Sequence, residues 1–174
     1  MSTIVIYSSK TGFVGKYAKW IAEDLGTRAV RAEDIKSEEL QKFDKIVYGG
    51  GLYAGGINGI KLIKKNLEKL EGKKIAVFAS GASPPRKETV EEVRDKNFTP
   101  EELEKIRFFY MRGGFDYDRL GMKDRMLMKL LKKKLESKKD LTEDEQGMLE
   151  AYEQPVDFTE RSNIEDLIEY VRGN

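Results

Sequence analysis

The 174-residue chain contains no cysteine and no histidine. Without cysteine it forms no disulfide and has no thiolate nucleophile, and this composition is typical of a reducing compartment, so we expect a cytoplasmic location. Without histidine it lacks the commonest metal ligand and acid–base group, which argues against zinc chemistry and hydrolase triads. We therefore expect no metal site and no catalytic protein side chain. If the protein is an enzyme, a cofactor carries the chemistry.

The chain also has no long apolar run, and its positive and negative charges are nearly balanced. No apolar run approaches the roughly 18 residues of a membrane-spanning helix. The net charge is only +1, so nothing in the overall charge predicts nucleic acid as a partner. With 39% apolar and 36% charged residues, the composition predicts one globular domain over residues 1–174.

The most informative stretch runs from residue 4 to residue 25. Its apolar, β-branched start at residues 4–7 predicts a buried parallel strand, and residues 16–25 have the pattern of an amphipathic helix. The loop between them would place backbone N–H groups at a helix N-terminus, where an anion is favoured. Ser9 and Thr11 add hydroxyl groups, and Gly12 lets the backbone close around a ligand. The stretch predicts binding of a phosphate ester.

Two common phosphate loops do not fit this stretch. A Walker loop needs Lys after its second glycine, whereas Lys10 precedes Thr11 and Gly12. A dinucleotide fingerprint needs three glycines, and only Gly12 and Gly15 are present, in the wrong register. An N-capped turn that binds nothing is the alternative interpretation.

Strand and helix patterns alternate along the rest of the chain. Further strands are predicted at residues 28–31, 44–48, 75–79 and 106–111, and helices at residues 58–70, 89–96, 122–139 and 162–171, the last opened by a capping box at Ser162. This alternation is typical of an α/β protein with a doubly wound parallel sheet and helices on both faces. The loops after the strands then meet at the carboxyl edge of the sheet, where we expect the site.

Glycines are concentrated in the loops expected at this edge. They include Gly12, the run at residues 49–51, Gly55, Gly81 and Gly114. Glycine there would permit positive φ and a close approach of backbone to a flat ligand, although many strand–helix turns need glycine in any case. Tyr53 lies among these small residues, where its ring could cover a planar heterocycle or simply pack over the turn.

Three parts of the chain resemble the flavodoxin superfamily. Ser9, Thr11 and Gly12 match its phosphate loop, although Val14 stands where a threonine is usual, and the loop around Tyr53 is similar to the one that covers a face of the flavin. Residues 112–135 resemble the branch that includes menaquinone-dependent protoporphyrinogen oxidase. The resemblance implies a five-stranded sheet of order 2-1-3-4-5 and non-covalently bound FMN. The cofactor-binding residues that it implies are Ser9, Lys10, Thr11, Gly12, Phe13, Val14, Gly51, Leu52, Tyr53, Ala54, Gly55, Gly56, Ser80, Gly81, Ala82, Ser83, Gly114, Phe115, Asp116 and Tyr117.

The function that follows is electron transfer through FMN, with a redox partner protein or a quinone as partner. Three alternatives stay open. One is an FMN-dependent oxidase like protoporphyrinogen oxidase that uses a quinone acceptor, and another is a non-catalytic flavin-binding or interaction module. The third and weakest is a quinone reductase or flavin-dependent nitro reductase. The sequence predicts no oligomeric state.

The predicted helix at residues 122–139 is strongly basic. It has eight Lys and Arg against two acidic residues, whereas residues 140–169 contain eleven acidic residues and one Arg. One interpretation is an interfacial helix that makes peripheral contact with the inner face of a membrane. The other is a packing helix of the fold whose charge the acidic segment neutralises.

Overall fold

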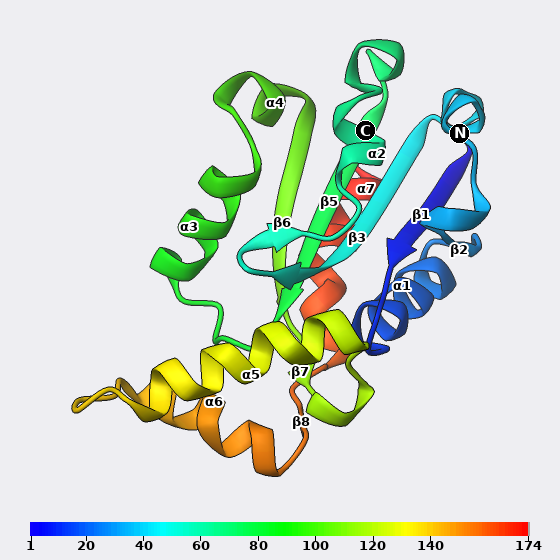
Figure 1. Ribbon diagram of the computed structural model, residues 1–174. Helices are drawn as coiled ribbons and strands as arrows, with labels where there is room; N and C mark the ends of the chain where they lie inside the picture. Colours follow the sequence, from blue (N-terminus) through cyan, green and yellow to red (C-terminus); the bar gives the residue numbers. More distant parts are fainter. Residues whose placement is uncertain (174) are drawn as a thin grey trace.

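The computed structural model describes residues 1–173 and contains a central parallel sheet (Figure 1). Five strands lie in the order β2-β1-β3-β5-β6. Their bounds are β1 Thr3–Ser8, β2 Ala29–Arg31, β3 Lys45–Tyr53, β5 Lys74–Gly81 and β6 Ile106–Arg112. This order confirms the predicted 2-1-3-4-5 arrangement. A short strand, β4 (Gly56–Ile57), adds an antiparallel hairpin to the end of β3.

Helices cover both faces of the sheet, which explains why the central strands are apolar throughout. α1 (Phe13–Asp24) and α7 (Glu165–Arg172) pack on one face with residues such as Val5, Val47 and Phe78. The other face is covered by α2 (Lys61–Lys64), the 3-10 turn η3 (Leu67–Leu70) and α3 (Lys87–Asn97). The remaining elements of the body are α4 (Pro100–Lys105), η1 (Ala32–Asp34), η2 (Ser37–Lys42) and η5 (Arg161–Ile164), and a further 3-10 turn, η4 (Tyr117–Arg119), follows the last strand of the sheet.

Two predicted helices differ from the observed ones. The helix expected at residues 58–70 starts later, because Gly59 has a φ of 73°, and it is divided into α2 and η3 at Asn66, where the backbone leaves the helical region. The capping box expected at Ser162 is wrong. That residue lies inside η5, and α7 starts after Ile164 without a side-chain cap.

The glycine run at residues 49–51 is also different from the prediction, because it belongs to strand β3 and not to a loop. A Cβ atom on Gly49 would lie 2.0 Å from Cζ of Phe78, and one on Gly50 would lie 2.5 Å from the carbonyl oxygen of Asn58. These glycines therefore permit close packing over the strand. Positive φ at this edge is found at Gly12 (97°) and Gly55 (78°).

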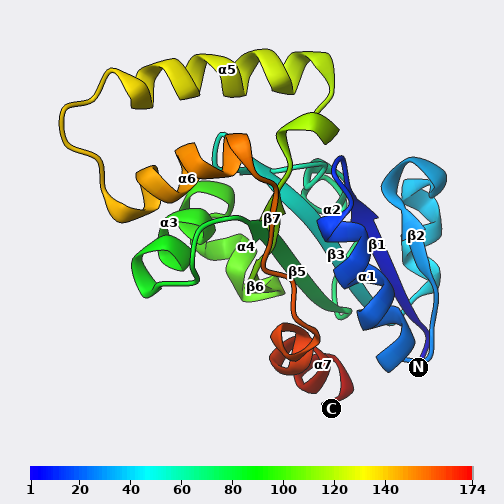
Figure 2. The same cartoon turned by 90° about the horizontal axis from the view of Figure 1, so that it is seen from below.

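A helical hairpin lies across the carboxyl edge of the sheet, clear of the layers that cover its two faces (Figures 1 and 2). It consists of α5 (Met122–Glu136) and α6 (Glu143–Glu153). The chain enters and leaves it through a small antiparallel sheet formed by β7 (Gly114–Phe115) and β8 (Val156–Asp157). We call the two helices the roof.

The basic helix α5 is only partly a packing helix. Leu135 is buried, whereas Met122, Met126 and Leu130 are 89%, 69% and 63% exposed. Lysines of α5 and the following turn form ion pairs with α6, Lys132 with Glu153 and Lys138 with Glu145. Within residues 1–173, no helix combines the length and the apolar character needed to cross a membrane.

Candidate functional site

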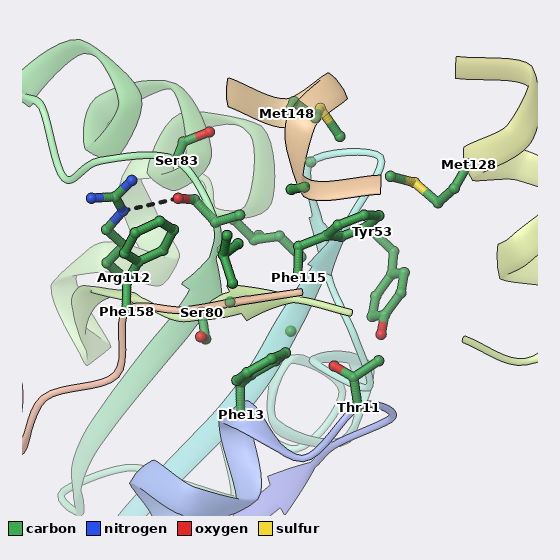
Figure 3. Close-up of a pocket in the computed structure, with 18 of the residues that line it drawn as sticks. Thr11, Phe13, Tyr53, Ser80, Ser83, Arg112, Phe115, Met128, Met148 and Phe158 are labelled. Carbon is green, nitrogen blue, oxygen red and sulfur yellow. Dashed lines mark hydrogen bonds between the residues drawn. The ribbon is translucent and has the colours of Figure 1, made fainter. Parts of the chain in front are cut away.

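A cavity of about 570 Å³ lies between the carboxyl edge of the sheet and the roof. Phe13 comes from the start of α1, Tyr53 from the end of β3 and Phe115 from β7, while Met128 and Met148 come from the two roof helices (Figure 3). Aromatic rings on one side and flexible thioethers on the other make an apolar space that suits a planar ligand.

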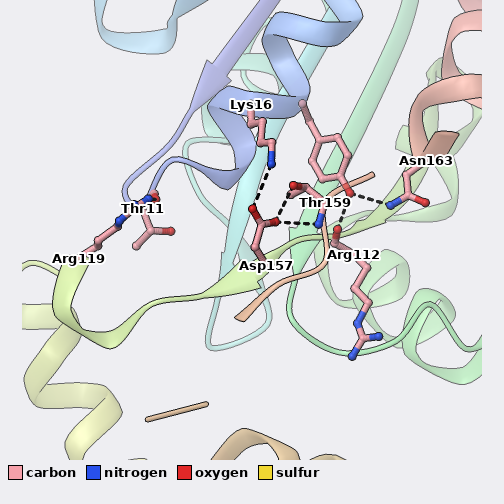
Figure 4. Close-up of polar contacts among 8 residues, drawn as sticks. Thr11, Lys16, Arg112, Arg119, Asp157, Thr159 and Asn163 are labelled. Atoms are coloured by element: carbon pink, nitrogen blue, oxygen red, sulfur yellow. Dashed lines mark hydrogen bonds and ion pairs between the residues drawn. The ribbon is translucent and has the colours of Figure 1, made fainter. Parts of the chain in front are cut away.

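One end of this cavity is formed by the loop between β1 and α1. The N-cap of α1 is Gly12, which has no side chain to cap the helix, and the first turn contains no acidic residue. The backbone N–H of Gly12 donates to the Ser9 hydroxyl at 3.2 Å, which folds the loop back over the helix start. The guanidinium of Arg119 donates to the carbonyl oxygen of Thr11 at 3.3 Å, so it lies directly beside the loop (Figure 4). Exposed helix N–H groups with cations nearby favour an anionic group here.

Tyr53 lies at the tip of the β3–β4 hairpin and lines the same cavity. The ammonium of Lys10 lies 4.2 Å from the centre of its ring and forms an ion pair with Asp124 of α5 at 2.7 Å. Burial, and secondarily the charge of Asp124, raises the pKa of Tyr53 to about 12. The Tyr53 hydroxyl is therefore neutral at physiological pH and can donate a hydrogen bond.

The hairpin that carries Tyr53 is held by the end of α3. Asn97, only 8% exposed, accepts a hydrogen bond from the backbone N–H of Ile57 at 2.9 Å and donates to the carbonyl oxygen of Gly55 at 2.8 Å. Lys96 donates to the carbonyl oxygen of Ala54 at 2.7 Å. No feature of the sequence identified Asn97 as a supporting residue, because Asn is a common residue near helix ends.

The loop after β5 is fixed by the neighbouring strand β6 and the residue that follows it. The hydroxyl of Tyr110 donates to the carbonyl oxygen of Ser83 at 2.8 Å, and Nε of Arg112 donates to that of Ala82 at 3.0 Å. The N–H of Gly113 donates to the carbonyl oxygen of Gly81 at 2.7 Å. With these carbonyl groups already bonded, the loop presents a preorganised wall to the cavity.

The structure brings nearly all the predicted cofactor-binding residues together. Those that line the cavity are Ser9, Lys10, Thr11, Phe13, Val14, Gly51, Leu52, Tyr53, Ala54, Gly55, Ser80, Gly81, Ala82, Ser83, Gly114, Phe115 and Asp116. Gly12, Gly56 and Tyr117 do not line it, although each is next to a residue that does. Val14 is only 4% exposed, so its side chain belongs mainly to the core. That these residues contact a cofactor stays a prediction.

The roof is the part of the site that the sequence did not predict. Its lining residues are Asp124, Leu127, Met128, Leu131, Glu143, Asp144, Gly147, Met148 and Ala151. The apolar periodicity of residues 122–135 was visible, but periodicity does not show which surface an apolar face covers.

A comparison with protein families identifies one family for most of the chain. The profile of the family described as "Flavodoxin domain" matches residues 4–142. No curated protein matches the chain at a significant level.

Several solved structures are similar to the chain. A flavodoxin from the domain Archaea is 21% identical, with 75% of this chain and 93% of that one covered and a TM-score of 0.43. The Trp repressor binding protein of Bacillus subtilis is 15% identical, with 64% and 83% covered and a TM-score of 0.47. A flavodoxin variant of Fusobacterium nucleatum, bound to flavin mononucleotide, is 20% identical, with 47% and 52% covered and a TM-score of 0.38.

Proposed function

The chain belongs to the flavodoxin-domain family, and from that premise we propose that it is a redox protein that transfers electrons through non-covalently bound FMN. The observation that carries the proposal is the cavity, because one end is an uncapped helix N-terminus and the rest is aromatic and apolar. A phosphate fits the first part and a flat ring fits the second.

The residues present have the chemistry that FMN requires. The hydroxyls of Ser9 and Thr11 and the N–H groups at the start of α1 would hold the phosphate, with Arg119 beside them. The rings of Tyr53 and Phe115 would contact the isoalloxazine, and the roof would keep water from it. Bound FMN supplies one- and two-electron redox chemistry, for which no protein acid or base is obligatory.

The first test is the visible absorption spectrum of the purified protein, followed by identification of any released chromophore by chromatography. If the protein is colourless, the apoprotein is titrated with FMN and the quenching of flavin fluorescence is measured. We expect one FMN per chain. A protein that refuses FMN at micromolar concentration would rule out the proposal and favour a non-catalytic interaction module.

Thr11→Val is expected to weaken FMN binding by about tenfold or more, because a hydrogen bond to a charged phosphate contributes roughly 1.5–3 kcal/mol. The matched control is Thr27→Val, which removes the hydrogen bond from a threonine hydroxyl to the carbonyl oxygen of Thr3, far from the cavity lining. The control should lose stability and keep its FMN affinity. Equal FMN affinity in both variants would show that Thr11 does not bind the phosphate.

A second candidate is an oxidase of the protoporphyrinogen oxidase kind, which passes electrons from a reduced planar substrate to a quinone. It is favoured by the apolar roof over the cavity and by the exposed stripe of Met122, Met126 and Leu130 on α5. Lysines beside this stripe suit an anionic membrane surface, where a quinone dissolves, or an acidic redox partner protein.

This candidate predicts that the photoreduced protein is reoxidised by a menaquinone analogue in vesicles that contain anionic lipid. The double variant Met126→Asp/Leu130→Asp should retain FMN but lose both vesicle co-sedimentation and rapid reoxidation. Reoxidation that is slow for the unaltered protein, or that does not change in the variant, would leave simple electron transfer as the function.

A further inference from the structure

A second hollow, of about 470 Å³, runs along α1 beside the loop between β1 and α1. We call it the α1 groove. It is lined by Tyr7, Ser9, Lys10, Gly12, Gly15, Lys16, Lys19, Trp20, Glu23 and Arg31. Ser9 and Lys10 also line the main cavity, so the phosphate-binding loop separates two adjoining spaces. A phosphate held by this loop would lie at the end of the groove.

Cations outnumber carboxylates among the residues that line the α1 groove. Four cations line it against a single carboxylate, that of Glu23, which already forms an ion pair with Arg161 at 3.0 Å. Three of the four cations are paired, Lys10 with Asp124 at 2.7 Å, Lys16 with Asp157 at 3.1 Å (Figure 4) and Arg31 with Glu33 at 3.3 Å. In residues 1–173, Lys19 has no ion pair. Lys19 is therefore the lysine of this groove that is most available to an anionic ligand.

The groove also contains an aromatic surface. Trp20, the single tryptophan of the chain, is partly exposed and lines the groove together with Tyr7. Its ring packs edge-on against Tyr17, with centroids 5.7 Å apart, and the ammonium of Lys16 lies 5.2 Å from its centre, so a base stacked on that face would replace the contact with Lys16. An indole held by a buried neighbour can stack on a nucleobase at little cost in side-chain freedom. Cations and an indole in one groove match a ligand that combines phosphate with a heteroaromatic base.

We propose that the α1 groove binds the adenylate half of FAD, so that the protein accepts FAD as well as FMN. This inference rests on the proposed flavin function. The flavin and its first phosphate would occupy the main cavity and the β1–α1 loop. The second phosphate would pass over Gly12 toward Lys16 and Lys19, and the adenine would stack on Trp20.

The test compares the dissociation constants of FAD and FMN for the full chain by quenching of flavin fluorescence. FAD should bind with an affinity within about tenfold of FMN or better. Trp20→Ala should weaken the binding of FAD by about tenfold, the effect expected for the loss of one base–aromatic stack. Trp20→Phe should retain most of the FAD affinity, and Lys19→Glu should weaken FAD severalfold through its reversed charge.

The affinity for FMN provides the control in each variant, since a folded protein should bind FMN unchanged after these substitutions. If FMN binds and FAD binds at least about a hundredfold more weakly, the inference is overturned while the proposed function stands. The same conclusion follows if both Trp20→Ala and Lys19→Glu leave the ratio of FAD to FMN affinity unchanged. If neither flavin binds the unaltered protein, the proposed function fails as well.

Discussion

Gly49→Ala is expected to lower the free energy of unfolding by about 3 kcal/mol, the upper part of the range for overpacked cores. The added Cβ would lie 2.0 Å from Cζ and 2.4 Å from Cε1 of Phe78. Phe78 is fully buried, and β3 is bonded to β1 on one side and β5 on the other, so neither the ring nor the strand has room to move.

Urea unfolding followed by circular dichroism measures this effect. The matched control is Gly147→Ala in α6, an exposed glycine at the cavity where an added Cβ would meet no atom within 4 Å. That substitution should stabilise the helix by roughly 0.5–1 kcal/mol, because alanine loses less backbone freedom than glycine. If Gly49→Ala changed the unfolding free energy by less than the control does, the close packing of β3 against Phe78 would be incorrect.

Asn97→Leu is expected to cost about 3 kcal/mol, since it leaves buried backbone groups without partners. The N–H of Ile57 and the carbonyl oxygen of Gly55 both lose the amide of Asn97, which bonds them at 2.9 Å and 2.8 Å. The β3–β4 hairpin then loosens, and Tyr53 with it. We therefore also expect FMN to bind about tenfold more weakly.

A buried asparagine elsewhere separates the two effects. Asn66, 9% exposed, makes one side-chain hydrogen bond, to the carbonyl oxygen of Leu62, and lies outside the cavity lining. Asn66→Leu should lower stability by about 1 kcal/mol and leave FMN affinity unchanged. Equal losses of FMN affinity in the two variants would mean that the hairpin does not depend on Asn97.

The parts of the fold that could be predicted from sequence are those set by local patterns. Apolar runs located all five parallel strands, and the loop from Ser9 to Gly12 could be placed because strand and helix signals flank it directly. The glycine run was wrongly predicted to be a loop. Glycine is needed there because the ring of Phe78, on the neighbouring strand, packs against Gly49. Contacts between residues distant in sequence leave no periodic signal, and these contacts place the roof and Asn97.

The candidate site also combines residues that local patterns predict with residues that contacts between distant parts of the chain bring in. Residues of the β1–α1, β3–β4 and β5 loops could be predicted because the carboxyl ends of parallel strands meet at one edge. The contribution of Met128 and Met148 depends on how α5 and α6 fold back over that edge, which the sequence pattern alone does not determine.

The small β7–β8 sheet has a consequence for how this protein could change over evolution. Gly114 pairs with Asp157 and Phe115 with Val156, so the chain leaves the body and returns to it at the same point. The segment between β7 and β8 is therefore an insertion whose two ends lie side by side. Doubling the length of such a segment costs only about 0.6 kcal/mol of closure entropy. Insertions, deletions or replacement of this segment would leave the central sheet in place, and the β1–α1 loop would lose its contacts with Arg119 and Asp124 only if those two residues were changed. The roof over the cavity could therefore diversify independently of the central sheet below it.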